Sequence, residues 1–146
     1  MDQLNFPEYS FEIQIQGQKK LIFDVVRKKF IPLTPEEWVR QHCIFHLNYH
    51  YQIPFSNLAV EREIRVLNLR KRFDIVSFAK NGSPQILIEC KAPSVPITQE
   101  TIIQAGVYNK KLDSQWMWIT NGIQHVWLQK IEDKIAFCEA PIRIDR

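Results

Sequence analysis

Long apolar segments and clustered cysteines are both missing from this sequence. No apolar run approaches the roughly 18 residues that a membrane-spanning helix requires, and the N-terminus MDQLNFPEYS has no basic region followed by an apolar stretch. The three cysteines, Cys43, Cys90 and Cys138, are far apart and odd in number. They suggest neither a disulfide framework nor a zinc site with CxxC spacing, so we expect reduced thiols in a cytoplasmic protein with no membrane partner.

Two common catalytic motifs are also absent. No GxxxxGK[ST] sequence is present to bind a nucleotide triphosphate, and the serines do not stand in a nucleophile elbow. What is present is a chain of 146 residues that is 45% hydrophobic and 24% charged, with a formal charge of +3. This size and composition predict one compact domain, and the small positive charge leaves nucleic acid open as a partner.

The hydrophobic patterning predicts an α/β sandwich around a mixed sheet. Alternation on both sides of a Gln-Gly-Gln turn indicates a β-hairpin over residues 11–26, followed by the basic link RKKFIPL. Thr34 and Pro35 mark the start of an amphipathic helix over residues 35–50, and a second helix is expected over residues 98–112. Strands are expected in LAVEREIRVL, RFDIVSFA and PQILIEC, then in WMWIT, IQHVWLQ and KIAFCEA.

Two acids stand at matching positions on the second and third of these strands. Asp74 and Glu89 are each about seven residues from the Asn-Gly turn that joins the strands, which puts them nearly opposite each other and within reach of one cation. Lys91 projects to the same face as Glu89, where its amine can help to activate a water beside Mg²⁺. An ordinary cross-strand salt bridge is the alternative that the D…ExK pattern alone leaves open.

Polar side chains on both expected helices are candidates to join this set. Gln104 and Tyr108 are four residues apart and share one helix face, although a solvated glutamine and a half-buried tyrosine are the alternative. Gly106 between them predicts close packing of this helix against the sheet. On the first helix, Glu36 falls on the apolar stripe and Glu37 points away from it. Glu36 is therefore the candidate third carboxylate, unless it only complements the helix dipole.

Basic residues gather just before Asp74, at Arg70, Lys71 and Arg72. Next to a metal they would form a phosphate clamp that binds nucleic acid without reading its sequence, and a solvated turn is the alternative. The N-terminal 33 residues carry a second basic group. Their hairpin would extend the sheet, cover its edge or form a dimer interface, and the sequence leaves these three possibilities open.

Histidine and tryptophan also recur at regular spacings. His42, His46 and His50 follow one another every four residues on the first helix, but no second segment offers matching metal ligands, so we interpret them as packing residues. A stacking platform for bases and core packing are both compatible with the tryptophans near the C-terminus. Their alternation in a strand favours packing, and they are Trp116, Trp118 and Trp127.

Five blocks in order carry a resemblance to a known family. TPEEWVRQ, RKRFDIVSF, ILIECKAPSVPI, QAGVYN and WITNG, over about residues 34–130, resemble the N-terminal nuclease domain of type I restriction enzyme R subunits, a branch of the PD-(D/E)XK nuclease superfamily. The resemblance implies a restriction-endonuclease-like α-β-β-β-α-β core with a central mixed sheet flanked by helices in residues 34–146, and a hairpin extension in residues 1–33. The implied activity is hydrolysis of DNA phosphodiesters with Mg²⁺ or Mn²⁺.

The same resemblance implies a role for each candidate residue. Asp74 and Glu89 match the metal-binding acids, Lys91 matches the catalytic lysine, and the Cys90 carbonyl would complete the metal ligands. The remaining matches are the helix-borne acid, Glu36, and the Gln-x-x-x-Tyr element that supports the site near DNA, Gln104 and Tyr108.

Two other interpretations stay open. One is a non-catalytic module of the same fold that binds nucleic acid or a protein, and the other is a nuclease subunit that is active only in a larger complex. Because the chain has no P-loop, ATP-driven translocation is excluded. DNA is the expected partner, with a homodimer or a recruiting protein as further possibilities.

Overall fold

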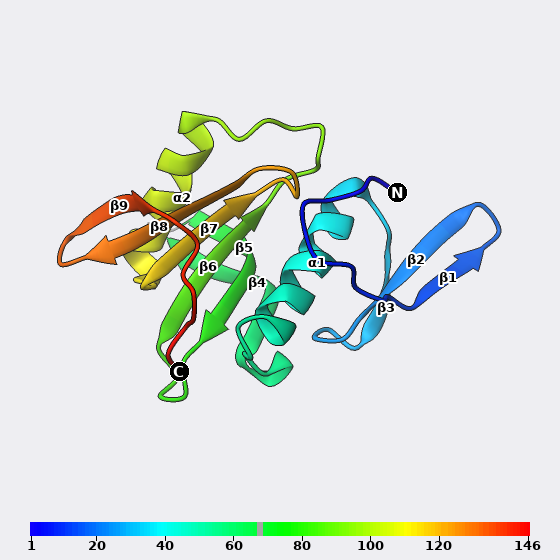
Figure 1. Ribbon diagram of the computed structural model, residues 1–146, viewed down its shortest axis with the longest axis horizontal. Coiled ribbons are helices and arrows are strands. Elements are labelled where there is room, and N and C mark those ends of the chain that lie inside the picture. The colour runs from blue at the N-terminus through cyan, green and yellow to red at the C-terminus, as the bar shows by residue number, and fades with distance from the viewer. Residues whose placement is uncertain (67–68) are drawn as a thin grey trace.

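The protein is described by a computed structural model that covers residues 1–66 and 69–146. In these residues the strands form two separate sheets, one of three strands and one of six. Helix α1 lies between the two sheets, and the three-stranded sheet extends from the far side of this helix (Figure 1). The chain is thus a mixed α/β protein, as its patterning predicts.

The small sheet has the order β1-β2-β3 and is antiparallel. Strands β1 (Ile13–Gln16) and β2 (Lys19–Asp24) form the expected hairpin. The prediction that the basic segment RKKFIPL is a link is wrong in part, because its residues Lys29–Pro32 form strand β3, which pairs with β2. Apolar partners explain this strand, since Phe30 pairs with Phe23 and their ring centroids are 5.2 Å apart. The hairpin does not extend the large sheet.

The large sheet has the order β4-β5-β6-β7-β8-β9. Every neighbouring pair is antiparallel except β6 and β7, which are parallel and are connected through α2. The connection from α1 into the sheet includes a short 3-10 helix, Phe55–Asn57. The six strands are β4 (Leu58–Val66), β5 (Leu69–Phe78), β6 (Pro84–Cys90), β7 (Trp116–Thr120), β8 (His125–Ile131) and β9 (Lys134–Cys138).

Helix α1 begins at the predicted cap, Thr34, and α2 begins one residue later than predicted, with Thr98 as its cap. The Thr34 side chain accepts a hydrogen bond from the backbone N–H of Glu37 at the start of α1 (Pro35–Tyr49). The Thr98 side chain accepts one from Thr101 at the start of α2 (Gln99–Leu112). These bonds satisfy N–H groups that have no partner inside the first turn, which fixes where each helix starts.

The two helices cover opposite faces of the large sheet (Figure 1). Helix α1 contributes Val39, Cys43 and Leu47 to a core with β5, β6 and β7, and α2 contributes Ala105 to a second core on the other face. The prediction that Gly106 packs closely against the sheet is wrong, because a Cβ atom added there meets nothing within 4 Å. The small residue at the contact is its neighbour, Ala105, which is 3% exposed.

His42, His46 and the three tryptophans are packing residues, as predicted, whereas His50 at the end of α1 is exposed. Trp118 and Trp127 are buried and stacked, with ring centroids 4.9 Å apart. His46 accepts or donates a hydrogen bond of 2.9 Å with Tyr9, and its ring stacks on His50. Within the described parts of the chain, no helix is both long enough and apolar enough to cross a membrane.

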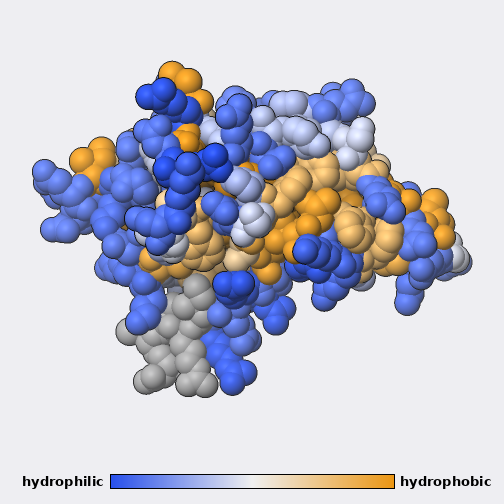
Figure 2. Space-filling view, turned by 90° about the horizontal axis from the view of Figure 1, so that it is seen from below, coloured by the Kyte–Doolittle hydropathy of each residue, from blue (hydrophilic) through white to orange (hydrophobic). Residues whose placement is uncertain are grey.

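Hydrophobic residues also reach the surface beside α1. Seen from below, they gather from the middle of the molecule toward the three-stranded sheet, and hydrophilic residues surround them (Figure 2). Ile13 and Ile15 on β1 are exposed, at 44% and 68%. The small sheet therefore covers part of α1 but leaves its own outer strand open to solvent.

Candidate nuclease site

The candidate site forms where β5 and β6 run side by side. Their pairing ends at Ile75 and Ile88, and Asp74 and Glu89 are the next residues along the two strands. This is the arrangement predicted by counting outward from the hairpin, where Gly82 has a φ of +85° in the Asn-Gly turn. Two carboxylates from separate strands are thus brought to one place.

Asp74 is held by contacts to both of its oxygens. Its Oδ2 accepts a hydrogen bond of 2.7 Å from the backbone N–H of Cys90, and its Oδ1 lies 2.8 Å from Nη2 of Arg40. The first contact crosses to β6 and the second reaches α1. The carboxylate is therefore fixed in orientation between a strand and a helix.

The Glu89 side chain lines a cavity together with residues of α2. Its Oε1 is buried without a hydrogen-bond partner. Burial, followed by the charge of Asp74, raises the pKa of the Glu89 carboxyl to about 9. A buried acid with an oxygen left unpaired is a group that a cation would stabilise.

A small cavity of about 30 Å³ opens at Glu89 under helix α2. Lys91 lines it beside Glu89, so the two members of the ExK pattern share one face as predicted. The backbone N–H of Lys91 donates to the Thr120 carbonyl at 2.8 Å, which continues the parallel pairing of β6 with β7 past the end of the strand. The backbone of Lys91 is thereby anchored just past the C-terminal end of β6.

The Gln-x-x-x-Tyr element of α2 lies on the other wall of this cavity. Gln104 Nε2 donates to the Tyr108 hydroxyl at 3.1 Å, and both side chains line the cavity with Lys91. The Lys71 amine lies 4.4 Å from the centroid of the Tyr108 ring. The structure thus brings Gln104, Tyr108 and Lys71 together with Glu89 and Lys91. Of the basic cluster, Arg70 and Arg72 are exposed on β5 instead.

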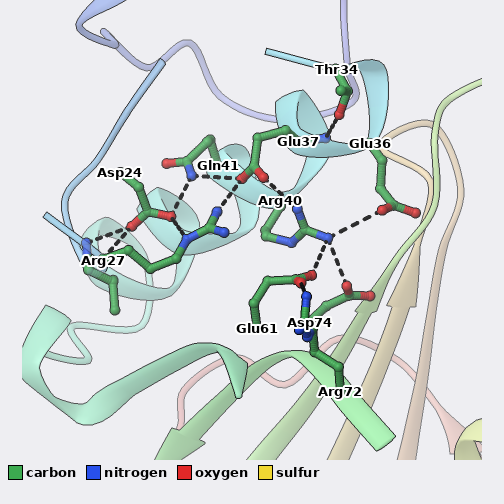
Figure 3. Close-up of polar contacts among 11 residues, drawn as sticks. Asp24, Arg27, Thr34, Glu36, Glu37, Arg40, Gln41, Glu61, Arg72 and Asp74 are labelled. Atoms are coloured by element: carbon green, nitrogen blue, oxygen red, sulfur yellow. Dashed lines mark hydrogen bonds and ion pairs between the residues drawn. The ribbon is translucent and has the colours of Figure 1, made fainter. Parts of the chain in front are cut away.

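Arg40 is the site residue that the sequence analysis missed. Figure 3 shows its guanidinium among carboxylates from α1, β4 and β5. Nη1 lies 2.6 Å from Glu37, while Nη2 lies 2.8 Å from Asp74, 2.8 Å from Glu61 and 3.3 Å from Glu36. Burial lowers the pKa of Arg40, but Asp74 and Glu37 raise it above its ordinary value, so the side chain stays charged. The i, i+4 spacing of Glu36 and Arg40 was the signal in the sequence.

The expected orientations of the two helix acids need correction. Glu37, expected to point away, is buried at 3% exposure, whereas the side chain of Glu36 is 45% exposed. The cause is the three-stranded sheet, which covers a second side of α1 and supplies Arg27 as a partner at 2.8 Å from Glu37. Glu36 still reaches the site, since its Oε2 lies 3.3 Å from Arg40 Nη2, and burial and then the charge of Asp74 raise the pKa of its carboxyl.

The acid network continues from Glu37 into the small sheet (Figure 3). Asp24 is fully buried and accepts hydrogen bonds from the backbone N–H groups of Val26 and Arg27, from Arg27 Nε and from Gln41 Nε2. Although burial opposes ionisation, these bonds lower the pKa of Asp24. The N-terminal sheet is thus tied to α1 by charge as well as by packing.

The TNG sequence after β7 supports the segment that follows Lys91. Asn121 Nδ2 donates to the Val95 carbonyl at 2.9 Å, and its Oδ1 accepts from Ile123 and Gln124. Gly122 has a φ of +85°, and a Cβ atom there would lie 2.8 Å from Leu4 Cδ2. Glycine is favoured at this φ, and the Asn121 contact ties the loop between Lys91 and α2 to the end of β7.

The oxygen ligands at this site suit a cation that needs few protein ligands and keeps several bound waters. In the described parts of the chain, no three His, Cys, Asp or Glu side chains are grouped so that they could hold a metal. Asp74 and Glu89 supply two carboxylates, and Mg²⁺ is commonly bound through one or two carboxylates with several waters. The unpaired Glu89 oxygen fits this role.

The chain matches the model of a known protein family. Residues 35–140 match the family described as type I restriction enzyme R protein N terminus. The matched range contains both helices, the whole large sheet and every candidate site residue. A search of curated proteins finds no match.

Proposed function

Because the chain belongs to the family of type I restriction enzyme R protein N-terminal domains, we propose that it is a Mg²⁺-dependent DNA endonuclease that works without an ATPase motor. The observation that carries the proposal is that Glu89 and Lys91 line one cavity with Gln104 and Tyr108, while Asp74 is hydrogen-bonded to the backbone of Cys90 between them. The order of helices and strands from α1 to β7 supports a restriction-endonuclease-like core.

In this proposal, Asp74 and Glu89 hold the metal together with the main-chain carbonyl of Cys90. When bound, Mg²⁺ would stabilise negative charge on the phosphate that is attacked. Mn²⁺ would serve in the same way, since both ions prefer oxygen ligands. A structural ion pair would give Glu89 a partner. Its Oε1 is buried and has none, which supports a bound cation at this position.

The other residues act on water and DNA. The Lys91 amine orients the attacking water, and its position beside Glu89 in the same cavity supports this role. Gln104 and Tyr108 stand where the DNA backbone would approach. Lys71 lies against Tyr108, and Arg70 and Arg72 are exposed nearby on the same strand. These basic side chains would bind DNA phosphates without reading the base sequence. Glu36 remains the candidate helix-borne acid.

The test is cleavage of supercoiled plasmid and of single-stranded DNA in Mg²⁺ or Mn²⁺. The wild type is compared with Asp74→Ala/Glu89→Ala and with a matched control, Asp133→Ala/Glu139→Ala, which removes two exposed acids far along the chain. Cleavage by the wild type and the control, but not by the site variant, is expected. Equal cleavage by all three proteins would contradict the proposal.

The two other interpretations give different results in the same experiment. A nuclease subunit that needs a larger complex would bind metal but cut neither substrate. A binding module would bind DNA or a protein without binding metal, and Asp74 would then serve only as the partner of Arg40.

A further inference from the structure

The space between Glu36 and Asp74 is already filled by a cation of the protein. Nη2 of Arg40 lies 3.3 Å from Glu36 Oε2 and 2.8 Å from Asp74 Oδ1, and it also contacts Glu61 Oε1 at 2.8 Å. A second metal ion in the proposed site would need these same oxygens, because they are the acidic atoms on the α1 side of Asp74 (Figure 3). One guanidinium nitrogen therefore takes up the ligands that a second ion would use.

Arg40 is also fixed in this position. Its side chain is 6% exposed, and Nη1 lies 2.6 Å from Glu37. Glu37 is itself held by Arg27 at 2.8 Å and by Gln41 at 3.0 Å. Moving the guanidinium away would leave a buried charge and several carboxylates without partners, which is strongly unfavourable.

The β6 side of Asp74 carries the other candidate ligand atoms. Oδ2 points to β6, where it accepts the Cys90 N–H, and Glu89 stands across the ladder with Oε1 unpaired. A carboxylate oxygen has two lone pairs, so Oδ2 keeps one for a cation on the Glu89 side. The two sides of Asp74 thus differ, with a built-in cation on one and free ligand oxygens on the other.

We propose that Arg40 takes the place of a second metal ion, so that the site binds one divalent cation per chain and Glu36 pairs with Arg40 instead of ligating metal. Arg40 is then a positioning residue that sets the orientation of Asp74. This inference rests on the proposed nuclease function and decides a question within it, since Glu36 would otherwise be the third acid of the metal site.

The test is the number of Mn²⁺ ions bound at saturation, measured by electron paramagnetic resonance and isothermal titration calorimetry. One ion per wild-type chain is expected, and two would overturn the inference. Glu36→Gln should keep one ion with affinity within twofold of the wild type. A tenfold or larger loss of affinity would overturn the inference, because it would make Glu36 a ligand.

A second variant tests Arg40 itself. Arg40→Gln, checked for folding by circular dichroism, should bind a second Mn²⁺ because Glu36, Glu61 and Asp74 lose their shared cation. A folded variant that still binds one ion with unchanged affinity would overturn the inference. If this variant does not fold, the wild-type stoichiometry and Glu36→Gln still decide the matter.

Failure of the inference and failure of the proposed function give different results. Two ions in the wild type with DNA cleavage would leave the nuclease standing and remove the role of Arg40. One ion without cleavage would keep the role of Arg40 and count against a nuclease that acts alone. No bound ion would remove both.

Discussion

The backbone N–H of Cys90 donates a hydrogen bond of 2.7 Å to Oδ2 of Asp74, and this contact fixes an acid of one strand against the main chain of the next. Cys90 stands between Glu89 and Lys91, so the bond aligns the whole ExK segment with Asp74. The side chain of Cys90 is buried on the α1 face, which leaves its main chain to serve the site. The geometry therefore depends on the backbone and leads to tests on the neighbouring side chains.

Replacing Lys91 by alanine should remove activity without removing metal. A positioned amine that assists proton transfer contributes on the order of a hundredfold or more to rate, so we expect at least that loss in nicking of supercoiled plasmid. Mn²⁺ affinity and the unfolding midpoint should stay close to the wild-type values. Lys80→Ala, an exposed lysine in the β5–β6 turn, is the control and should cleave normally. An unchanged nicking rate in Lys91→Ala would exclude the proposed role.

Replacing Arg40 by methionine should destabilise the fold strongly. The change leaves Glu37 and Asp74 without their shared cation, and loss of one partner from a buried ion pair costs about 3–5 kcal/mol. Arg72→Met is the matched control, because Arg72 pairs with Glu61 at 3.3 Å but its own side chain is 60% exposed. Such a surface pair contributes about 0–1 kcal/mol. Urea unfolding measures both, and equal losses would show that the Arg40 network adds little to stability.

Acidification should lower stability through His46. Burial, together with His50 and His125, lowers the pKa of the His46 ring to about 4. Between pH 6.5 and 4 the His46 ring is protonated in the unfolded chain and neutral in the folded chain. The free energy of unfolding therefore falls as the pH is lowered through this range. We expect about 2 kcal/mol from this group, because part of the ring meets solvent. Above pH 6.5 it has no effect.

The check is urea unfolding of the wild type and of His46→Phe at pH 7.5 and pH 5. Burial also lowers the pKa of His42 and of His125, so the variant should keep part of the pH dependence. The difference between the two proteins isolates His46. Identical pH dependence in both would contradict the prediction.

Two glycines should respond to alanine in opposite ways. Gly122→Ala puts a Cβ 2.8 Å from Leu4 Cδ2 at a φ of +85°, so a loss of about 1–3 kcal/mol is expected. Gly106→Ala meets nothing within 4 Å inside α2, and alanine favours a helix by about 0.5–1 kcal/mol, so this variant should be more stable. Thermal unfolding of the pair tests both directions. Destabilisation by Gly106→Ala would contradict the second prediction.

Local patterns were enough to place most elements. The cap at Thr34, the prolines before Thr98, the alternation in the strands and the Asn-Gly turn at residues 81 and 82 predict where the helices and the β5–β6 hairpin lie. The pairing of that hairpin ends at Ile75 and Ile88, next to Asp74 and Glu89. These features could be read from the sequence because each depends on residues that are close together in the chain.

The tertiary structure decided the rest, because it depends on which surfaces meet. The three-stranded sheet covers a side of α1 that the helical pattern marks as exposed, and this buries Glu37 where Glu36 was expected. The sequence patterns assign no role to Arg40, and the packing of β4 and β5 brings Glu61 and Asp74 against it. The sequence by itself determined the acids, the lysine and their strand register. Only packing between distant segments determined which cation stands beside Asp74, since burial makes an unpaired charge too costly to leave alone.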